Sequence, residues 1–179
     1  MGREGNRMDE RDEEFTAFVA ARSGPLLRYA YLLTGDHASA EDLLQSTLVK
    51  VYLSWHKIAD HRSVDAYTRT AMTRTNISVW RKVGRREYAT ETTPDEAVED
   101  RHDIDERDGM WALLQTLGSR QRTALVLRFY EDLPEAEIAD IMGCSLGTVK
   151  SQISRGLANL RKVVPARDQM WERGLGHAG

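Results

Sequence analysis

The sequence contains a single cysteine, Cys144, which excludes an internal disulfide and a zinc site built from cysteines alone. It has only four prolines and 7% aromatic residues, and its most common residues favour helices. No apolar run approaches the roughly 18 residues that a membrane span requires. The first residues are too densely charged for a signal peptide. These absences predict an all-α, cytoplasmic protein built from one or two small domains.

Acidic residues are missing from two long stretches, although the whole chain has 28 acidic residues against 25 Lys and Arg. The first stretch, Ala66–Arg86, carries six basic residues with Tyr67 and Trp80 between them, and the second runs from Ile141 to Arg167. Between them, residues 85–108 carry ten acids and four arginines. A nucleic-acid partner would explain this segregation, because phosphate attracts Lys and Arg and repels carboxylates. Solvated basic faces, or chance, are the alternatives.

Hydrophobic periodicity divides the chain into two helical domains joined by a polar tether. Within the first domain, Gly24 and Pro25 are expected to interrupt the helical pattern. The acidic tether has almost no apolar anchors and is expected to be flexible, although part of it could form a solvated helix. We expect a disordered N-terminus (1–13), a first helical domain (14–84), a flexible acidic linker (85–108), a second helical domain (109–164) and a C-terminal tail (165–179).

The clearest helix runs from Ala40 to Trp55, where apolar residues recur at the i, i+3, i+4 and i+7 positions of an amphipathic helix. Asp36 or Ser39 can cap its start by accepting a hydrogen bond from a free backbone N–H. The outward face of this helix presents Asp42, Gln45, Ser46 and Val49, which suits a protein partner better than DNA. A merely solvated face is the alternative.

The segment "EAEIADIMGCSLGTVKSQISRGLANLRK" has the anatomy of a helix-turn-helix. Gly143 permits the turn, and Ser145 is placed to cap the second helix. The buried stripe of that helix leaves basic and hydroxyl side chains on its outer face, where a recognition helix enters the major groove. The candidate DNA-reading residues are Thr148, Lys150, Ser151, Ser154 and Arg155.

Together these segments resemble the extracytoplasmic-function (group 4) sigma factors of bacterial RNA polymerase. The segment "GDHASAEDLLQSTLVKVYLSW" is similar to sigma regions 2.1–2.2, and "DAYTRTAMTRTNISVWRKVGRR" is similar to regions 2.3–2.4. The helix-turn-helix is similar to region 4.2. The resemblance covers roughly residues 14–162, and it implies an alternative sigma factor that binds core RNA polymerase and directs promoter recognition, DNA opening and transcription initiation.

The resemblance also assigns roles to residues. It implies that the helix over Ala40–Trp55 binds polymerase and that the second helix of the helix-turn-helix reads the −35 element. It also implies that the loop 59–63 is where the family varies its −10 specificity. Asn76 falls on the asparagine that the family uses near the flipped −10 base. The expected polymerase-binding residues are Asp42, Leu43, Gln45 and Val49, and the expected −10 residues are Arg69, Arg74, Asn76, Arg81 and Lys82. The family commonly has anti-sigma partners.

Two other classes of protein remain as alternatives. A stand-alone helix-turn-helix regulator would bind duplex DNA tightly without polymerase, usually as a dimer on a palindrome. The basic stretch Ala66–Arg86 disfavours this class, because a sensory or dimerisation domain does not need it. An enzyme would need converging nucleophile, base or metal residues, and the five histidines show no metal-ligand spacing. We therefore expect no catalytic activity, no metal and no cofactor.

Overall fold

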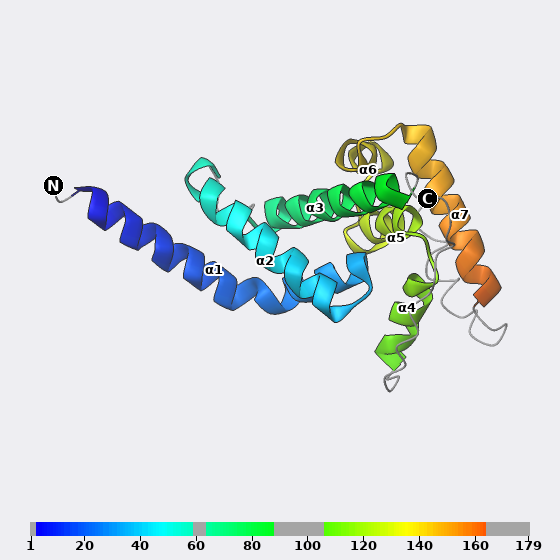
Figure 1. Ribbon diagram of the computed structural model, residues 1–179, viewed down its shortest axis with the longest axis horizontal. Coiled ribbons are helices and arrows are strands. Elements are labelled where there is room, and N and C mark those ends of the chain that lie inside the picture. Colours follow the sequence, from blue (N-terminus) through cyan, green and yellow to red (C-terminus); the bar gives the residue numbers. More distant parts are fainter. Residues whose placement is uncertain (1–2, 59–63, 88–105, 164–179) are drawn as a thin grey trace. The chain divides into compact units, whose positions relative to one another are not determined.

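The computed structural model describes residues 3–58, 64–87 and 106–163, and every regular element in these stretches is helical (Figure 1). The chain divides into two compact units, Met1–Glu91 and Thr92–Gly179. The first unit contains α1 (Arg3–Thr34), α2 (His37–Ser54), the short 3₁₀ turn η1 (Trp55–Lys57) and α3 (Val64–Glu87). The second contains α4 (Glu106–Gln115), α5 (Ser119–Leu125), the π turn η3 (Val126–Tyr130), α6 (Glu135–Met142) and α7 (Leu146–Val163).

Helix α1 is longer than expected, because it continues through Pro25. The expected interruption at Gly24 and Pro25 is therefore corrected. Proline removes one backbone donor from a helix, but the residues that follow it, Leu26, Tyr29 and Ala30, are fully buried. Burial of this apolar face in the core of the first unit outweighs the cost of the missing hydrogen bond.

Helix α1 begins at Arg3, within the segment 1–13 for which we expected disorder. Arg11 donates a hydrogen bond to the hydroxyl of Tyr52 on α2, and that hydroxyl donates to Asp12 Oδ1 at 2.8 Å. The ring of Phe15 lies edge-on to Tyr52 and to Trp55, with centroid distances of 5.1 and 5.3 Å. These contacts with the end of α2 stabilise the helical conformation of α1 around Arg11, Asp12 and Phe15.

The expected amphipathic helix is α2, which packs beside α1 in the first unit (Figure 1). Asp36 accepts a hydrogen bond from the backbone N–H of Ser39 at 2.8 Å, so Asp36 is the residue that caps the helix. Gly35 adopts a positive φ of 89°, which lets the chain leave α1 within two residues. The buried side of the helix consists of Ala40, Leu43, Leu44, Thr47 and Val51.

The core of the second unit forms where α5 and α6 pack against α7. Val126, Leu127, Ile138 and Val149 are all buried there. The amide of Asn159 on α7 donates a hydrogen bond to Gln121 Oε1 on α5 at 3.0 Å, which fixes the register of the two helices. One side of α7 is therefore buried in the unit, and the opposite side of that helix remains accessible for other contacts.

Candidate functional site

The helix-turn-helix has the expected turn. Gly143 ends α6 with φ 60° and ψ 46°, the left-handed conformation that glycine adopts most easily. Ser145 Oγ then accepts a hydrogen bond from the backbone N–H of Thr148 at 3.1 Å, which caps α7. Val149, Ile153 and Leu160 are buried against the rest of the unit. The turn and the cap therefore fix which face of α7 points outward.

That outward face carries the residues expected to read DNA. Lys150, Ser154 and Arg155 are exposed, and Thr148 and Ser151 are half-buried beside them. No acidic residue occurs on α7 itself, but Glu135 at the start of α6 places its Oε2 atom 3.9 Å from Lys150 Nζ. The face is thus basic and rich in hydroxyls, with one neighbouring carboxylate that the sequence pattern did not reveal.

A second basic surface lies on α3. Arg74, Arg81 and Lys82 are exposed, as is Tyr67, which keeps 44% of its surface accessible. Trp80 is half-buried, and the Arg81 guanidinium lies 5.6 Å from the centre of its ring. Exposed cations with an exposed aromatic ring suit a nucleic-acid backbone and unpaired bases.

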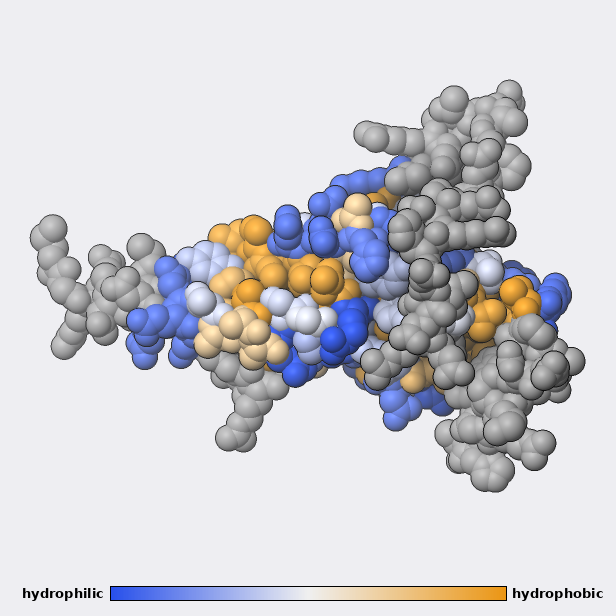
Figure 2. All heavy atoms as spheres, turned by 90° about the horizontal axis from the view of Figure 1, so that it is seen from below, coloured by the Kyte–Doolittle hydropathy of each residue, from blue (hydrophilic) through white to orange (hydrophobic). Residues whose placement is uncertain are grey.

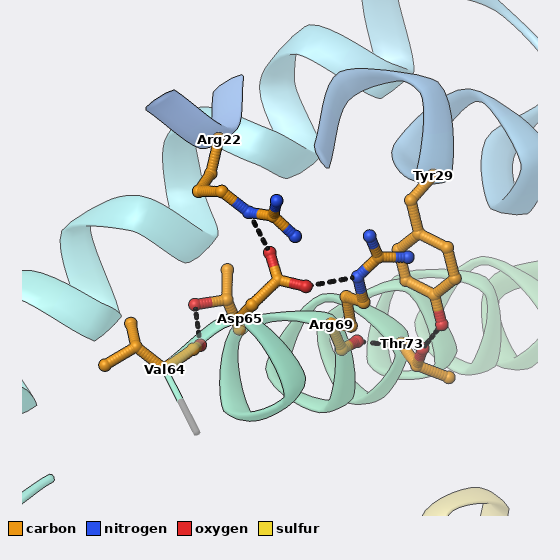
Figure 3. A network of polar contacts seen from close by, with 7 residues as sticks. Arg22, Tyr29, Val64, Asp65, Arg69 and Thr73 are labelled. Atoms are coloured by element: carbon orange, nitrogen blue, oxygen red, sulfur yellow. Dashed lines mark hydrogen bonds and ion pairs between the residues drawn. The ribbon is translucent and has the colours of Figure 1, made fainter. Parts of the chain in front are cut away.

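Arg69 is placed differently from the other arginines of α3, because a network of polar contacts holds it (Figure 3). Asp65 Oδ2 accepts from Arg69 Nε at 2.9 Å, while Asp65 Oδ1 accepts from Arg22 Nε of α1 at 2.8 Å. Only 15% of the Arg69 side chain is exposed, and its guanidinium lies 5.3 Å from the centre of the Tyr29 ring. Arg69 therefore links α3 to α1 in this structure.

The charges in this network shift the pKa values of its members. Partial burial of Asp65 by itself would raise the pKa of the carboxyl, but the hydrogen bonds and positive charges of Arg22 and Arg69 outweigh it and hold that pKa below its ordinary value. The hydrogen bond to Asp65 raises the pKa of Arg22. Asp65 is consequently a carboxylate at neutral pH that bridges two cations.

Asn76 lies in the interior of the first unit, with 9% of its surface exposed. Its side-chain amide donates to the carbonyl of Leu33, in the last turn of α1, at 3.4 Å. Such carbonyls have no partner within their own helix, so a side-chain donor from another helix stabilises the helix end. Nearby, the buried hydroxyls of Tyr29 and Thr73 lie 2.7 Å apart and join the same two helices.

The outward face of α2 presents Asp42, Gln45 and Val49, whereas Leu43 is 95% buried and belongs to the core. One exposed residue was missed in the sequence. Leu53 lies one turn beyond Val49, and these two keep 64% and 59% of their surfaces accessible. The i, i+4 spacing of the two apolar side chains was the signal that could have found it. Apolar side chains also reach the face drawn in Figure 2, where an orange area lies beside blue polar side chains.

Some expected features lie outside the described residues, namely the loop 59–63, most of the acidic linker (88–105) and the C-terminal tail. In the described parts of the chain, no three His, Cys, Asp or Glu residues gather where they could hold a metal ion. No helix among the described residues combines the length and apolarity needed to cross a bilayer.

Comparison with known families matches both units. Residues 9–86 match the family described as Sigma-70 region 2, and residues 107–160 match the family described as Sigma-70, region 4. The first match covers α1 to α3, apart from its ends, and the second covers α4 to most of α7. The α2 and α3 surfaces therefore fall in the region 2 match, and the α7 surface falls in the region 4 match.

Individual relatives agree with these matches. The chain is 40% identical over 156 residues to the RNA polymerase sigma-E factor of Streptomyces avermitilis, covering 87% of each chain. It is 26% identical over 134 residues to the RNA polymerase sigma factor SigV of Bacillus subtilis, covering 75% of this chain and 81% of the relative. Among solved structures, the sigma factor RpoE in complex with the anti-sigma factor NepR from Bartonella quintana is similar, with a TM-score of 0.62, 27% identity and coverage of 84% of this chain and 96% of the other.

Proposed function

The chain belongs to the extracytoplasmic-function group of RNA polymerase sigma factors, and we propose that three surfaces divide its work in transcription initiation. As a member of this group it is an alternative sigma factor that directs initiation. Sigma factors are initiation factors, so the chain's residues act by binding. The proposal concerns which residues contact polymerase, the −10 element and the −35 element.

The polymerase-binding surface is the outward face of α2. Asp42 and Gln45 supply polar contacts, and Val49 with Leu53 supplies exposed apolar area. Exposed apolar side chains beside polar ones are typical of a protein interface and contribute little to DNA binding. Leu43 supports this face from within the core, where its burial fixes the rotation of the helix.

The −10 surface is the exposed side of α3. Arg74, Arg81 and Lys82 face solvent and can neutralise phosphates, and Tyr67 offers a ring for stacking on an unpaired base. Removing a base from the duplex costs a few kcal/mol, which such contacts together with polymerase binding must supply. Arg69 and Asn76 act as positioning residues for this surface. Asn76 donates to Leu33 of α1, and Arg69 lies against the Tyr29 ring of α1 and pairs with Asp65, which also pairs with Arg22 of α1.

The −35 surface is the outer face of α7. Its basic and hydroxyl residues project from a helix that Ser145 caps and whose opposite side is buried in the unit. This is the geometry in which the N-terminal half of a recognition helix enters the major groove. The observation that carries the proposal is this exposed face, on which Lys150 and Arg155 lie without an acidic residue on the same helix.

Promoter-directed transcription with purified core RNA polymerase tests the proposal. The chain should allow specific initiation, and Lys150→Glu should reduce it by at least tenfold because a carboxylate then faces DNA phosphate. The matched control is Arg28→Glu, the same change of charge at an exposed position of α1. Polymerase binding should be unchanged in both variants. Loss of polymerase binding in Lys150→Glu would contradict the division of labour.

The partners follow from the same proposal. The chain acts in the cytoplasm with core RNA polymerase and promoter DNA, and it needs no cofactor for binding. Because a solved relative was captured in complex with an anti-sigma factor, we expect an anti-sigma factor to regulate this chain as well. A stand-alone regulator would instead bind a palindromic duplex as a dimer without polymerase.

A further inference from the structure

Leu146 is the first residue of α7, and it is exposed although the next two large apolar residues of that helix, Val149 and Ile153, are buried. It keeps 44% of its surface accessible, whereas Val149 and Ile153 keep 0% and 8%. Packing of α7 therefore depends less on Leu146 than on Val149 and Ile153. The cap does not depend on Leu146, because Ser145 and Thr148 make that hydrogen bond.

Leu146 lies at the N-terminal end of the proposed recognition helix. Residues three and four apart are neighbours on a helix, so Leu146 lies one turn before both the buried Val149 and the exposed Lys150, at the edge of the −35 surface. Helical side chains lean towards the N-terminus of their helix, and the N-terminal residues of a recognition helix contact base edges. Leu146 is thus the residue of α7 that would enter the major groove first.

The chemistry of the groove selects the partner of an apolar side chain there. Base pairs present hydrogen-bond donors and acceptors along the edge of the major groove, and the single apolar group among them is the C5 methyl of thymine. A leucine side chain cannot satisfy a donor or an acceptor, so it would leave any other base edge desolvated and without a hydrogen bond. We infer that Leu146 reads a thymine in the −35 element by contact with its C5 methyl group, an inference that rests on the proposed role of α7.

The neighbouring charges agree with DNA rather than an apolar protein surface as the partner. Lys150, Ser154 and Arg155 are exposed on the same helix, and Glu135 Oε2 lies 3.9 Å from Lys150 Nζ. An apolar docking surface would place these charged side chains in a desolvated interface without partners, which is costly. On DNA, phosphates and polar base edges supply those partners, and the thymine methyl covers Leu146.

The test compares thymine with deoxyuridine, which lacks only the methyl group. The preferred −35 element is first selected from a randomised promoter library with the full chain bound to core polymerase. Each thymine of that element is then replaced singly by deoxyuridine, and competition binding is measured for the wild-type chain and Leu146→Ala. Val163→Ala is the matched control, since Val163 is an exposed apolar residue at the opposite end of α7, with 48% of its surface accessible.

At one thymine, the wild-type chain should lose about fourfold in affinity on methyl removal, the effect of exposing one methyl-sized group. Leu146→Ala should bind the thymine duplex about fourfold more weakly and show no further loss with deoxyuridine. Val163→Ala should behave as the wild type does. A thymine preference that survives unchanged in Leu146→Ala, or its absence from the wild type, would overturn the inference while leaving the −35 role of α7 intact. Failure to enrich any −35 sequence would instead overturn the proposed function itself.

Discussion

Gly156 of α7 packs so closely on Leu125 of α5 that an added Cβ atom would lie 2.9 Å from Leu125 Cδ1 and 3.4 Å from Gln121 Cβ. Leu125 is 96% buried and cannot swing into solvent to make room. The close approach sets how far the recognition helix stands from the rest of the second unit. Glycine at this position is therefore part of the geometry of the DNA-binding surface.

Replacing Gly156 with alanine should destabilise the second unit. Overpacking costs about 1–3 kcal/mol, and the higher helix propensity of alanine offsets about 1 kcal/mol of it, so we expect a net loss of about 1 kcal/mol. The matched control is Gly147→Ala on the same helix, where the nearest atom to the new Cβ is 3.8 Å away. That variant should be equally or more stable than the wild type. Hydrogen exchange over α5 and α7 measures both, and equal effects at the two glycines would contradict the packing argument.

The Arg22–Asp65–Arg69 network should make the first unit less stable in acid. The pKa of Asp65 is lowered in the folded state, so its contribution is fully present above the ordinary value of 3.8 and is lost as the pH falls through the lowered pKa. Asp65→Asn should reduce the free energy of unfolding at neutral pH by about 1–2 kcal/mol. It should also flatten the dependence on pH below about 5.

Denaturant unfolding at a series of pH values, followed by the hydrogen exchange of α1 and α3, provides the measurement for Asp65. Glu41→Gln serves as the control, because Glu41 is an exposed carboxylate of the same unit. An acid dependence that is the same in wild type and Asp65→Asn would show that other carboxylates cause it.

The aromatic contacts between α1 and the end of α2 predict a stability role for the charged N-terminal segment. Phe15 is half-buried against Tyr52 and Trp55, so Phe15→Ala should destabilise the first unit by about 1.5–2.5 kcal/mol, roughly half the cost for a fully buried phenylalanine. Thr16→Ala, at the exposed neighbouring position, should change stability by less than about 0.5 kcal/mol. A Phe15 variant as stable as the Thr16 variant would contradict this role.

Asn76→Ala should lower both stability and promoter opening, because the amide holds the end of α1 against α3. We expect a loss of about 1 kcal/mol in the free energy of unfolding. Permanganate footprinting of the melted −10 region, with binding to the −35 element as an internal reference, measures opening separately from stability. Arg74→Ala is the contrasting variant, since Arg74 is exposed and should affect opening with little change in stability. An unchanged free energy of unfolding in Asn76→Ala would contradict this positioning role and favour a direct contact of Asn76 with the −10 bases.

Features with a local cause could be predicted from the sequence. The amphipathic pattern of α2 and the cap at Asp36 depend on residues within one or two turns of each other, and both are present in the structure. The turn at Gly143 and the cap at Ser145 are local in the same way. The family resemblance rests on such segments, which is why the sequence alone reveals it.

Features that depend on distant contacts could not be predicted. The continuity of α1 through Pro25 results from burial in a three-helix core, and local propensity argues against it. The contacts of Asp12 and Glu14 in α1 are with Tyr52 and Trp55, about 40 residues away in the chain. The burial of Asn76, which pairs with Leu33, has the same non-local origin. Outward and inward positions on α3 were thus the least predictable part of the candidate site.

The central claim is that the chain docks on core RNA polymerase through the outward face of α2, and co-elution on gel filtration tests it most directly. The variants are the double mutant Asp42→Arg with Gln45→Ala and, as the matched control, Glu13→Arg with Gln152→Ala, which changes a carboxylate and a glutamine outside α2. We predict stoichiometric co-elution for the wild type and the control, and its loss for the α2 double mutant. A folded α2 double mutant that still co-elutes, or a wild-type chain that binds duplex DNA as a dimer and never co-elutes with polymerase, would contradict the account.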